Sequence, residues 1–150
     1  VLGLHAAAIV QLLGSVSEDV RQRAIDVLSK LDASVLGLHA DAIVRFLRDG
    51  RADVRQHALG MLFDLGSLVI MQRSEEIAQR LGDVDLKVRR VALRRLNELD
   101  VATLAGYAWA MAQRVKDADP EVRGSAFQAL CQLQAGRQVQ NNTRKTIFHV

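Results

Sequence analysis

The stretch DGRADVRQHALGMLFDL, residues 49–65, decides the fold because near copies of it recur along the chain. The copies are SEDVRQRAIDVLSKL at 17–31, DLKVRRVALRRLNEL at 85–99 and DPEVRGSAFQALCQL at 119–133, and the last residues of the four stretches, 31, 65, 99 and 133, lie 34 residues apart. Within every copy the apolar residues fall at i, i+4, i+8 and i+11. This spacing places them in one stripe along a helix.

Five columns of the alignment keep one residue type in all four copies, namely a valine, an arginine, an alanine and two leucines. Their members are Val20, Val54, Val88 and Val122; Arg21, Arg55, Arg89 and Arg123; Ala24, Ala58, Ala92 and Ala126; Leu28, Leu62, Leu96 and Leu130; and Leu31, Leu65, Leu99 and Leu133. A fixed period of this length is typical of a tandem repeat protein. The recurring alanine, with its small side chain, predicts close packing between two helices.

The stripe predicts one helix in each copy, which we term the second helix of the repeat. These helices are expected at about residues 18–31, 52–65, 86–99 and 120–133. Ser17, Asp85 and Asp119 are suitable N-caps, and Pro120 occupies the first helical position, where its missing N–H does no harm. Arg51 stands at the cap position of the second copy and does not fit this pattern.

Another apolar pattern of the same period lies between these segments and predicts the first helix of each repeat. The first helices are expected at about residues 4–14, 38–48, 72–82 and 104–116. Short turns make each pair an antiparallel hairpin, and a single hairpin cannot bury its apolar stripe, so the hairpins must stack. The sequence therefore predicts an all-α solenoid over residues 1–136, with repeats at about 1–34, 35–68, 69–102 and 103–136.

The motif D…VR..A…L..L, present as DGRADVRQHALGMLFDL and DADPEVRGSAFQALCQL, resembles HEAT and HEAT-like repeats of the armadillo-type α-solenoid family. The resemblance covers residues 1 to about 135 and implies a right-handed α-α superhelix whose second helices line the concave surface. It also implies a ladder of ion pairs between neighbouring repeats, since an arginine in the first turn of a helix opposes the helix dipole and needs a carboxylate nearby. The ladder residues are Asp49, Asp83, Asp117, Arg21, Arg55, Arg89 and Arg123.

Motifs that carry chemistry are missing from the sequence. None of the four histidines stands in a metal-binding pattern, and there is no glycine-rich phosphate loop or nucleophile elbow. Cys131 aligns with Ser29, Phe63 and Asn97, a variable column, which indicates a tolerated thiol. We therefore predict no enzyme activity, no cofactor and no metal.

A single cysteine cannot form an internal disulfide, which favours an intracellular setting, either the cytoplasm or an organelle interior such as a chloroplast or mitochondrion. No stretch reaches the ~18–20 apolar residues of a membrane span, so we predict no membrane span.

The net charge of +3 and the pI near 9.5 raise the question of nucleic-acid binding. Counted by repeat, however, the net charges are −1, 0, +1 and 0, and the excess lies in Arg137, Arg144 and Lys145. The one basic cluster lies on the second helix of the third repeat. It does not continue into neighbouring repeats as a phosphate-binding stripe would. It comprises Lys87, Arg89, Arg90, Arg94 and Arg95. Nucleic acid is therefore expected to be the less favoured partner.

The predicted function is a non-catalytic protein–protein interaction or scaffold module, a subunit or fragment of a larger assembly whose partners are other protein subunits. The candidate partner surface comprises Gln22, Arg23, Asp26, Gln56, His57, Arg90, Arg94, Ser125, Gln128, Ile147 and Phe148. One alternative is a nucleic-acid-binding HEAT-like solenoid. A second follows from the resemblance, because HEAT-like repeats also occur in phycobilin lyases: an accessory subunit or lyase-like factor of an organellar photosynthetic complex.

The repeat register fails after Gln134, so residues 137–150 are predicted to be a basic arm, a degenerate cap or the start of a degenerate helix. Tyr107 and Trp109 are the only Tyr and Trp of the chain and are expected in the core or at a partner contact. VLGLHA at residues 1–6 returns at 35–40, so the chain begins inside a repeat. We therefore expect further repeats before Val1 or other chains over the ends of the stack.

Overall fold

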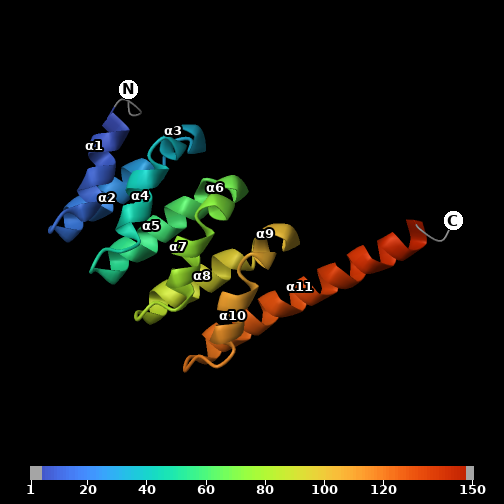
Figure 1. Cartoon of the computed structure of the whole chain (residues 1–150). Coiled ribbons are helices and arrows are strands. Elements are labelled where there is room, and N and C mark those ends of the chain that lie inside the picture. Colours follow the sequence, from blue (N-terminus) through green and yellow to red (C-terminus); the bar gives the residue numbers. More distant parts are fainter. Residues whose placement is uncertain (1–4, 148–150) are drawn as a thin grey trace.

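The structure is a computed structural model that describes residues 5–147, and within that range all regular structure is helical. Pairs of helices follow one another along a single stack, from the first repeat in blue to the last in red (Figure 1). This arrangement confirms the predicted all-α solenoid with four helical repeats. The stack places the first and last repeats at opposite ends of the molecule (Figure 1).

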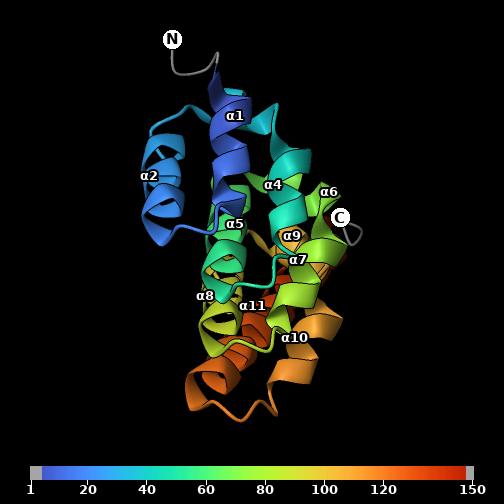
Figure 2. The same ribbon diagram turned by 90° about the vertical axis from the view of Figure 1, so that its left-hand side faces the viewer.

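The two helices of each pair form two layers, which are seen from the end of the stack in Figure 2. The first helices are α1 (Ala6–Gln11), which continues as the 3₁₀ turn η2 (Leu12–Gly14), α4 (Ala40–Phe46), α7 (Ser74–Leu81) and α10 (Ala108–Arg114). The second helices are α2 (Glu18–Leu28), α5 (Ala52–Asp64), α8 (Leu86–Leu96) and α11 (Pro120–Ile147). Within the second-helix layer, α5 packs on α8 and α8 packs on α11.

Three short helices lie where the sequence predicted turns: α3 (Ala33–Gly37), α6 (Ser67–Gln72) and α9 (Val101–Ala105). The predicted start of a helix at residue 104 was therefore wrong, because Leu104 belongs to α9 and α10 begins at Ala108. Asp100 starts α9, since its carboxylate accepts hydrogen bonds from the backbone N–H and hydroxyl of Thr103 at 2.9 and 2.7 Å. Gly66 precedes α6 with φ of 95°, a conformation that favours glycine over other residues.

The predicted caps differ in how they act. Asp85 accepts hydrogen bonds from the N–H groups of Lys87 and Val88, and Asp119 accepts one from Val122. Ser17 precedes α2, but its hydroxyl makes no capping hydrogen bond, which corrects the prediction. The N–H of Ser17 instead donates to the hydroxyl of Ser15.

The core follows the predicted columns. The alanine column is at most 2% exposed in every repeat, and the leucine column that begins at Leu28 is fully buried in the first three repeats. Tyr107 is also buried, and its hydroxyl donates a hydrogen bond of 2.9 Å to the carbonyl of Ile70. Burial raises the pKa of this phenol above its usual value. Trp109, in contrast, is 78% exposed.

The second helix of the last repeat does not end near residue 133 as predicted but runs on to Ile147 within α11. Polar residues of the extension leave it largely exposed, and it extends beyond the stack in Figure 1. Gly136 lies where α11 passes α9, and a Cβ there would come within 2.5 Å of a Val101 methyl group, so only glycine fits. The side chain of Ile147 and the whole of Phe148 lie outside the described residues.

Candidate binding surface

The joints between repeats are built on the recurring arginine, and the joint between α5 and α8 shows the pattern most fully. The Nη1 group of Arg55 donates to the carbonyls of Asp49 and Gly50, in the turn that precedes its own helix. Its Nε and Nη2 groups donate to the Asp83 carboxylate of the next repeat at 2.9 and 2.7 Å. One guanidinium therefore fixes a turn in its own repeat and also binds the neighbouring repeat.

The pattern repeats between α8 and α11, where Arg89 lies 3.0 Å from the carboxylate of Asp117. At the first joint the partner changes. The repeat register points to Asp49 as the partner of Arg21, but the structure pairs Arg21 with Asp53 at 2.8 Å. Asp49 is bound by Arg51 instead, at 2.9 Å.

The structure explains why an arginine, Arg51, stands at the N-cap position of the second repeat. Arg51 does not cap α5 through its side chain but reaches back to the first repeat, where it donates to the carbonyls of Gly14 and Ser15. Arg51 thus takes the place expected for Arg21 as the partner of Asp49, and it also links the second repeat to the first. Arg51 lowers the pKa of the Asp49 carboxyl through a side-chain hydrogen bond, which outweighs the effect of burial.

The buried joint carboxylate, Asp83, is the most enclosed acid of the ladder, and its side chain is only 1% exposed. Burial alone would raise its pKa. The hydrogen bonds from Arg55 and from the backbone of Asp85, together with the charges of Arg55 and Arg80, outweigh burial and hold that pKa below its usual value. Asp83 is therefore charged in the folded chain at neutral pH and helps to fix the second joint.

The predicted partner surface lies mainly on α2, α5, α8 and α11, which we call the second-helix face. Gln22 donates to the Asp26 carboxylate at 3.0 Å on exposed α2, where Arg23 is exposed too. On α11, Gln128 is exposed and Ser125 half-buried, and the Ser125 carbonyl accepts a hydrogen bond from Asn97. The remaining described members of the surface are Gln56, His57, Arg90 and Arg94.

Four of the five basic side chains in the α8 cluster pair with acidic side chains of the chain itself. Arg90 lies 2.6 Å from Asp119 and 3.0 Å from Glu121, and Arg94 lies 3.6 Å from Glu121. Arg90 therefore joins two repeats, a role that sequence reasoning missed because its acidic partners lie on another helix. The other pairs of the cluster are Arg89 with Asp117 and Arg95 with Asp64 and Glu98.

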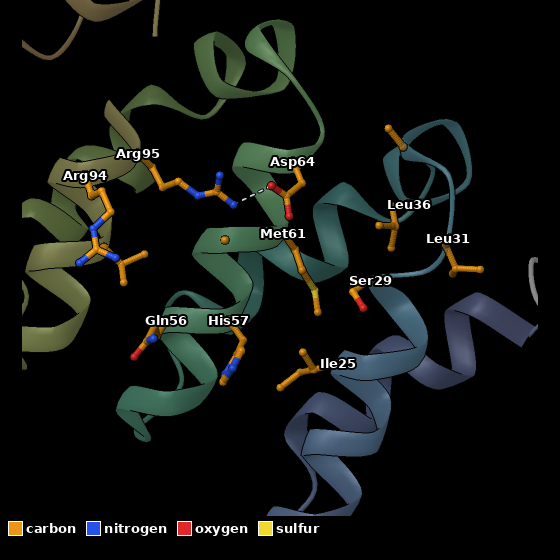
Figure 3. Close-up of a pocket in the computed structure, with 13 residues that line it drawn as sticks. Ile25, Ser29, Leu31, Leu36, Gln56, His57, Met61, Asp64, Arg94 and Arg95 are labelled. Atoms are coloured by element: carbon orange, nitrogen blue, oxygen red, sulfur yellow. Dashed lines mark hydrogen bonds and ion pairs between the residues drawn. The ribbon is translucent and has the colours of Figure 1, made fainter. Parts of the chain in front are cut away.

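A hollow of about 350 Å³ opens between α2, α3, α5 and α8 on the second-helix face (Figure 3). Its apolar lining includes Ile25, Leu36 and Met61. Gln56, His57 and Arg94, which sequence reasoning had placed on the partner surface, also line it. Figure 3 shows polar side chains from α5 and α8 on one side of the hollow, and Ile25 of α2 and Ser29, which directly follows α2, on the other.

The hollow arises from one variable column of the repeat. Ser29 lines it, and the equivalent residue in the next repeat is Phe63, which is buried. In the third repeat Asn97 bridges the joint by donating to the Ser125 carbonyl of α11 at 3.1 Å. The serine is too small to fill this space, and Gly60 facing it carries no side chain, so α2 packs less closely on α5 than α5 does on α8.

The charges around the hollow are predominantly basic. Arg95 is bound to Asp64 at 2.6 Å, while Arg94 has a side chain that is 66% exposed and is only loosely paired with Glu121. His57 is held by its Nδ1, which lies 2.7 Å from the carbonyl oxygen of Asp53. The rim therefore offers an accessible arginine beside an apolar floor, an arrangement suited to an apolar side chain with a carboxylate next to it.

Within residues 5–147, no three or more His, Cys, Asp or Glu side chains are grouped so that they could hold a metal ion. No helix of this range is both long and apolar enough to cross a lipid bilayer. Cys131 is a free and exposed thiol.

No family model matches the sequence, and no curated protein matches it. Solved structures do match. A designed armadillo repeat protein in complex with the peptide (KR)4 superimposes with a TM-score of 0.64 at 19% identity, over 85% of this chain and 64% of that one. The fold is that of an armadillo/HEAT-like repeat protein.

Two further structures support this armadillo/HEAT-like assignment. Cex1p matches with a TM-score of 0.66 at 20% identity, over 87% of this chain and 28% of that one. An engineered protein matches with a TM-score of 0.62 at 20% identity, over 85% of this chain and 62% of that one. This armadillo/HEAT-like chain thus spans less than two thirds of the length of each of these structures.

Proposed function

We propose that the chain is a non-catalytic scaffold module that binds a segment of another protein along its second-helix face. The observation that carries the proposal is the hollow between α2, α5 and α8, which combines an apolar lining with an exposed arginine. A volume of about 350 Å³ accommodates a large apolar side chain together with part of its backbone. The designed armadillo repeat protein, solved with a peptide, supports this use of the fold.

The chemistry of the rim defines the partner segment. Ile25 and Met61 offer an apolar surface, and the exposed Arg94 lies beside it. Apolar anchors in a pocket contribute most of the affinity of such interfaces, while charges at the rim contribute specificity. The partner segment is therefore expected to carry a leucine-like or aromatic residue next to an aspartate or glutamate.

A protein partner is favoured over nucleic acid by the ion pairs of α8. A phosphate-binding surface needs arginines that are free to neutralise phosphates. Arg90 is occupied by Asp119 and Glu121, and Arg95 by Asp64. Most of the basic cluster is therefore already paired within the chain.

The experiment that tests this proposal is selection of peptides from a random display library against the immobilised chain, followed by affinity measurement with the enriched peptides. We expect a consensus with an apolar residue beside an acidic one. Ser29→Phe places a ring in the hollow and should weaken binding about tenfold or more, since an anchor pocket carries much of the affinity. Arg94→Ala should weaken binding several-fold and reduce its dependence on salt.

The matched control is Cys131→Phe, which introduces the same side chain at the equivalent position of α11, away from the hollow. This variant should bind the selected peptides as the unmodified chain does. Equal affinity of the Ser29→Phe and Cys131→Phe variants, or a library from which no apolar-acidic consensus emerges, would contradict the proposed site.

A further inference from the structure

The last repeat leaves one half of a joint open. In the joints within the chain, the equivalent arginines Arg55 and Arg89 bind a carboxylate of the following repeat. Arg123 keeps the local half of this pattern, since its Nη1 donates to the carbonyls of Asp117 and Ala118 at 2.8 and 2.9 Å. Among residues 5–147, no carboxylate pairs with the other side of its guanidinium. Arg123 is thus held in position for a partner beyond the last repeat.

The apolar part of the same joint is open as well. Leu59 and Leu93, which precede Phe127 in one column of the repeat, are fully buried, whereas Phe127 is 64% exposed. Trp109 is 78% exposed and occupies the register position of Asp41, a residue that binds Arg73 of the following repeat. We call Trp109 of α10 and Arg123 and Phe127 of α11 the C-terminal edge of the stack. These two helices lie at one end of the stack in Figure 1.

The first repeat carries the complementary half. Asp19 occupies the register position of Asp53, the residue that Arg21 binds at the first joint, and Asp19 is exposed. Leu12 occupies the position of Phe46, whose ring lies 3.2 Å from the position a Cβ of Gly14 would take in the preceding repeat.

Leu12 is 45% exposed, because within the described residues no repeat precedes it. We call Leu12 and Asp19 the N-terminal edge. It offers a carboxylate and an apolar side chain where the C-terminal edge offers an arginine and two aromatic rings.

We infer that the C-terminal edge of one copy binds the N-terminal edge of a second copy, head to tail. The contact between Arg123 and Asp19 of the second copy repeats the pairing of Arg21 with Asp53 inside the chain. The interface would continue the stack in the register of its internal joints, with the aromatic rings covered by α1 and α2 of the added copy. A head-to-tail contact does not close on itself in a dimer, so further copies can add.

The mass of the 150-residue chain should be measured by sedimentation and light scattering over a concentration series from micromolar to millimolar. The average mass should rise with concentration from 16.5 kDa to values beyond a dimer. Arg123→Glu and Asp19→Arg should each weaken this association about tenfold or more, because each places like charges opposite one another. An equimolar mixture of the two variants should associate again, since every contact in it pairs opposite charges.

Glu18→Arg is the matched control, because it reverses the charge of the exposed residue next to Asp19 and should leave the association unchanged. Asp19→Arg keeps the test valid if Arg123→Glu fails to fold, because Arg123 holds a turn. Asp19 forms no ion pair among the described residues. A chain that remains monomeric throughout the series would overturn the inference. Association that survives both charge reversals, or variants that stay apart when mixed, would overturn it too.

Discussion

Two joints built from the same repeat differ in how completely their side chains are buried: the first joins α2 to α5, and the second joins α5 to α8. In the second joint, Arg55 and Asp83 form a buried pair and Phe63 is buried in the column that faces the next repeat. In the first joint, Arg21 binds Asp53, whose side chain is 43% exposed, and Ser29 leaves a hollow.

The difference teaches that the recurring columns and the variable columns have separate roles. The alanine column and the leucine column that begins at Leu28 are buried at both joints, so the helices stack in either case. The column of Ser29 and Phe63 decides whether the stacked surface is filled or hollow. A repeat protein can therefore gain a binding pocket by one substitution, without a change in its framework.

The largest expected effect comes from the carboxylates. Asp83→Ala leaves the buried Arg55 without its partner and should lower the free energy of unfolding by about 3–5 kcal/mol. Asp53→Ala also leaves a buried arginine, Arg21, without its carboxylate, but water can reach the place of the Asp53 side chain, which is 43% exposed, so the loss should be smaller, about 1.5–3 kcal/mol. Urea unfolding followed by circular dichroism measures both. Equal losses would show that the two joints do not differ in the way described.

The next largest effect concerns the variable column. Phe63→Ala opens the second joint as Ser29 opens the first, and it should lower the free energy of unfolding by about 3 kcal/mol. Cys131→Ala changes the same column where it is exposed and should alter that free energy by no more than about 0.5 kcal/mol. The urea midpoints of the two variants measure this difference in stability. A Phe63→Ala variant as stable as the Cys131→Ala variant would contradict the packing described for the second joint.

The smallest effect is a pH dependence. The pKa of Asp83 is lower in the folded chain than its usual value, so the stabilisation from its charge is complete above the unfolded-state pKa of about 4 and is lost as the pH falls through the folded-state value.

We expect the difference in unfolding free energy between the unmodified chain and Asp83→Asn to shrink as the pH falls from about 5 to about 2. Asp53→Asn should show a weaker dependence, because its carboxylate is more exposed. Denaturant unfolding at each pH measures this, and a difference independent of pH would exclude Asp83 as the titrating group.

The sequence predicts the second helices well because their pattern is long and regular. Val54, Ala58 and Leu62 fall on one face of α5 and all are buried. The short helices α3, α6 and α9 have only five or six residues, too few for the helical period to appear. Their start depends on local contacts such as the Asp100 cap, which resemble those of an ordinary turn.

The candidate site is less predictable because it depends on competition between residues far apart in sequence. The repeat register pairs Arg21 with Asp49, and only the folded chain shows that Arg51 takes Asp49 and leaves Asp53 for Arg21. The sequence likewise shows that Ser29 stands in a variable column. That this column borders the next repeat, and that its variation opens a hollow, depends on the stacking of α2 on α5.

The two-sided arginine has a consequence for how such a chain can change length in evolution. Arg55 carries the contact to its own turn and the contact to the next repeat on one side chain. The segment of one repeat period that carries Asp83 and Arg89 therefore holds both a carboxylate for the repeat before and an arginine for the repeat after. A gene duplication of one such segment would insert a repeat whose joints match at both ends, so the array can lengthen or shorten without the remaining repeats having to adapt.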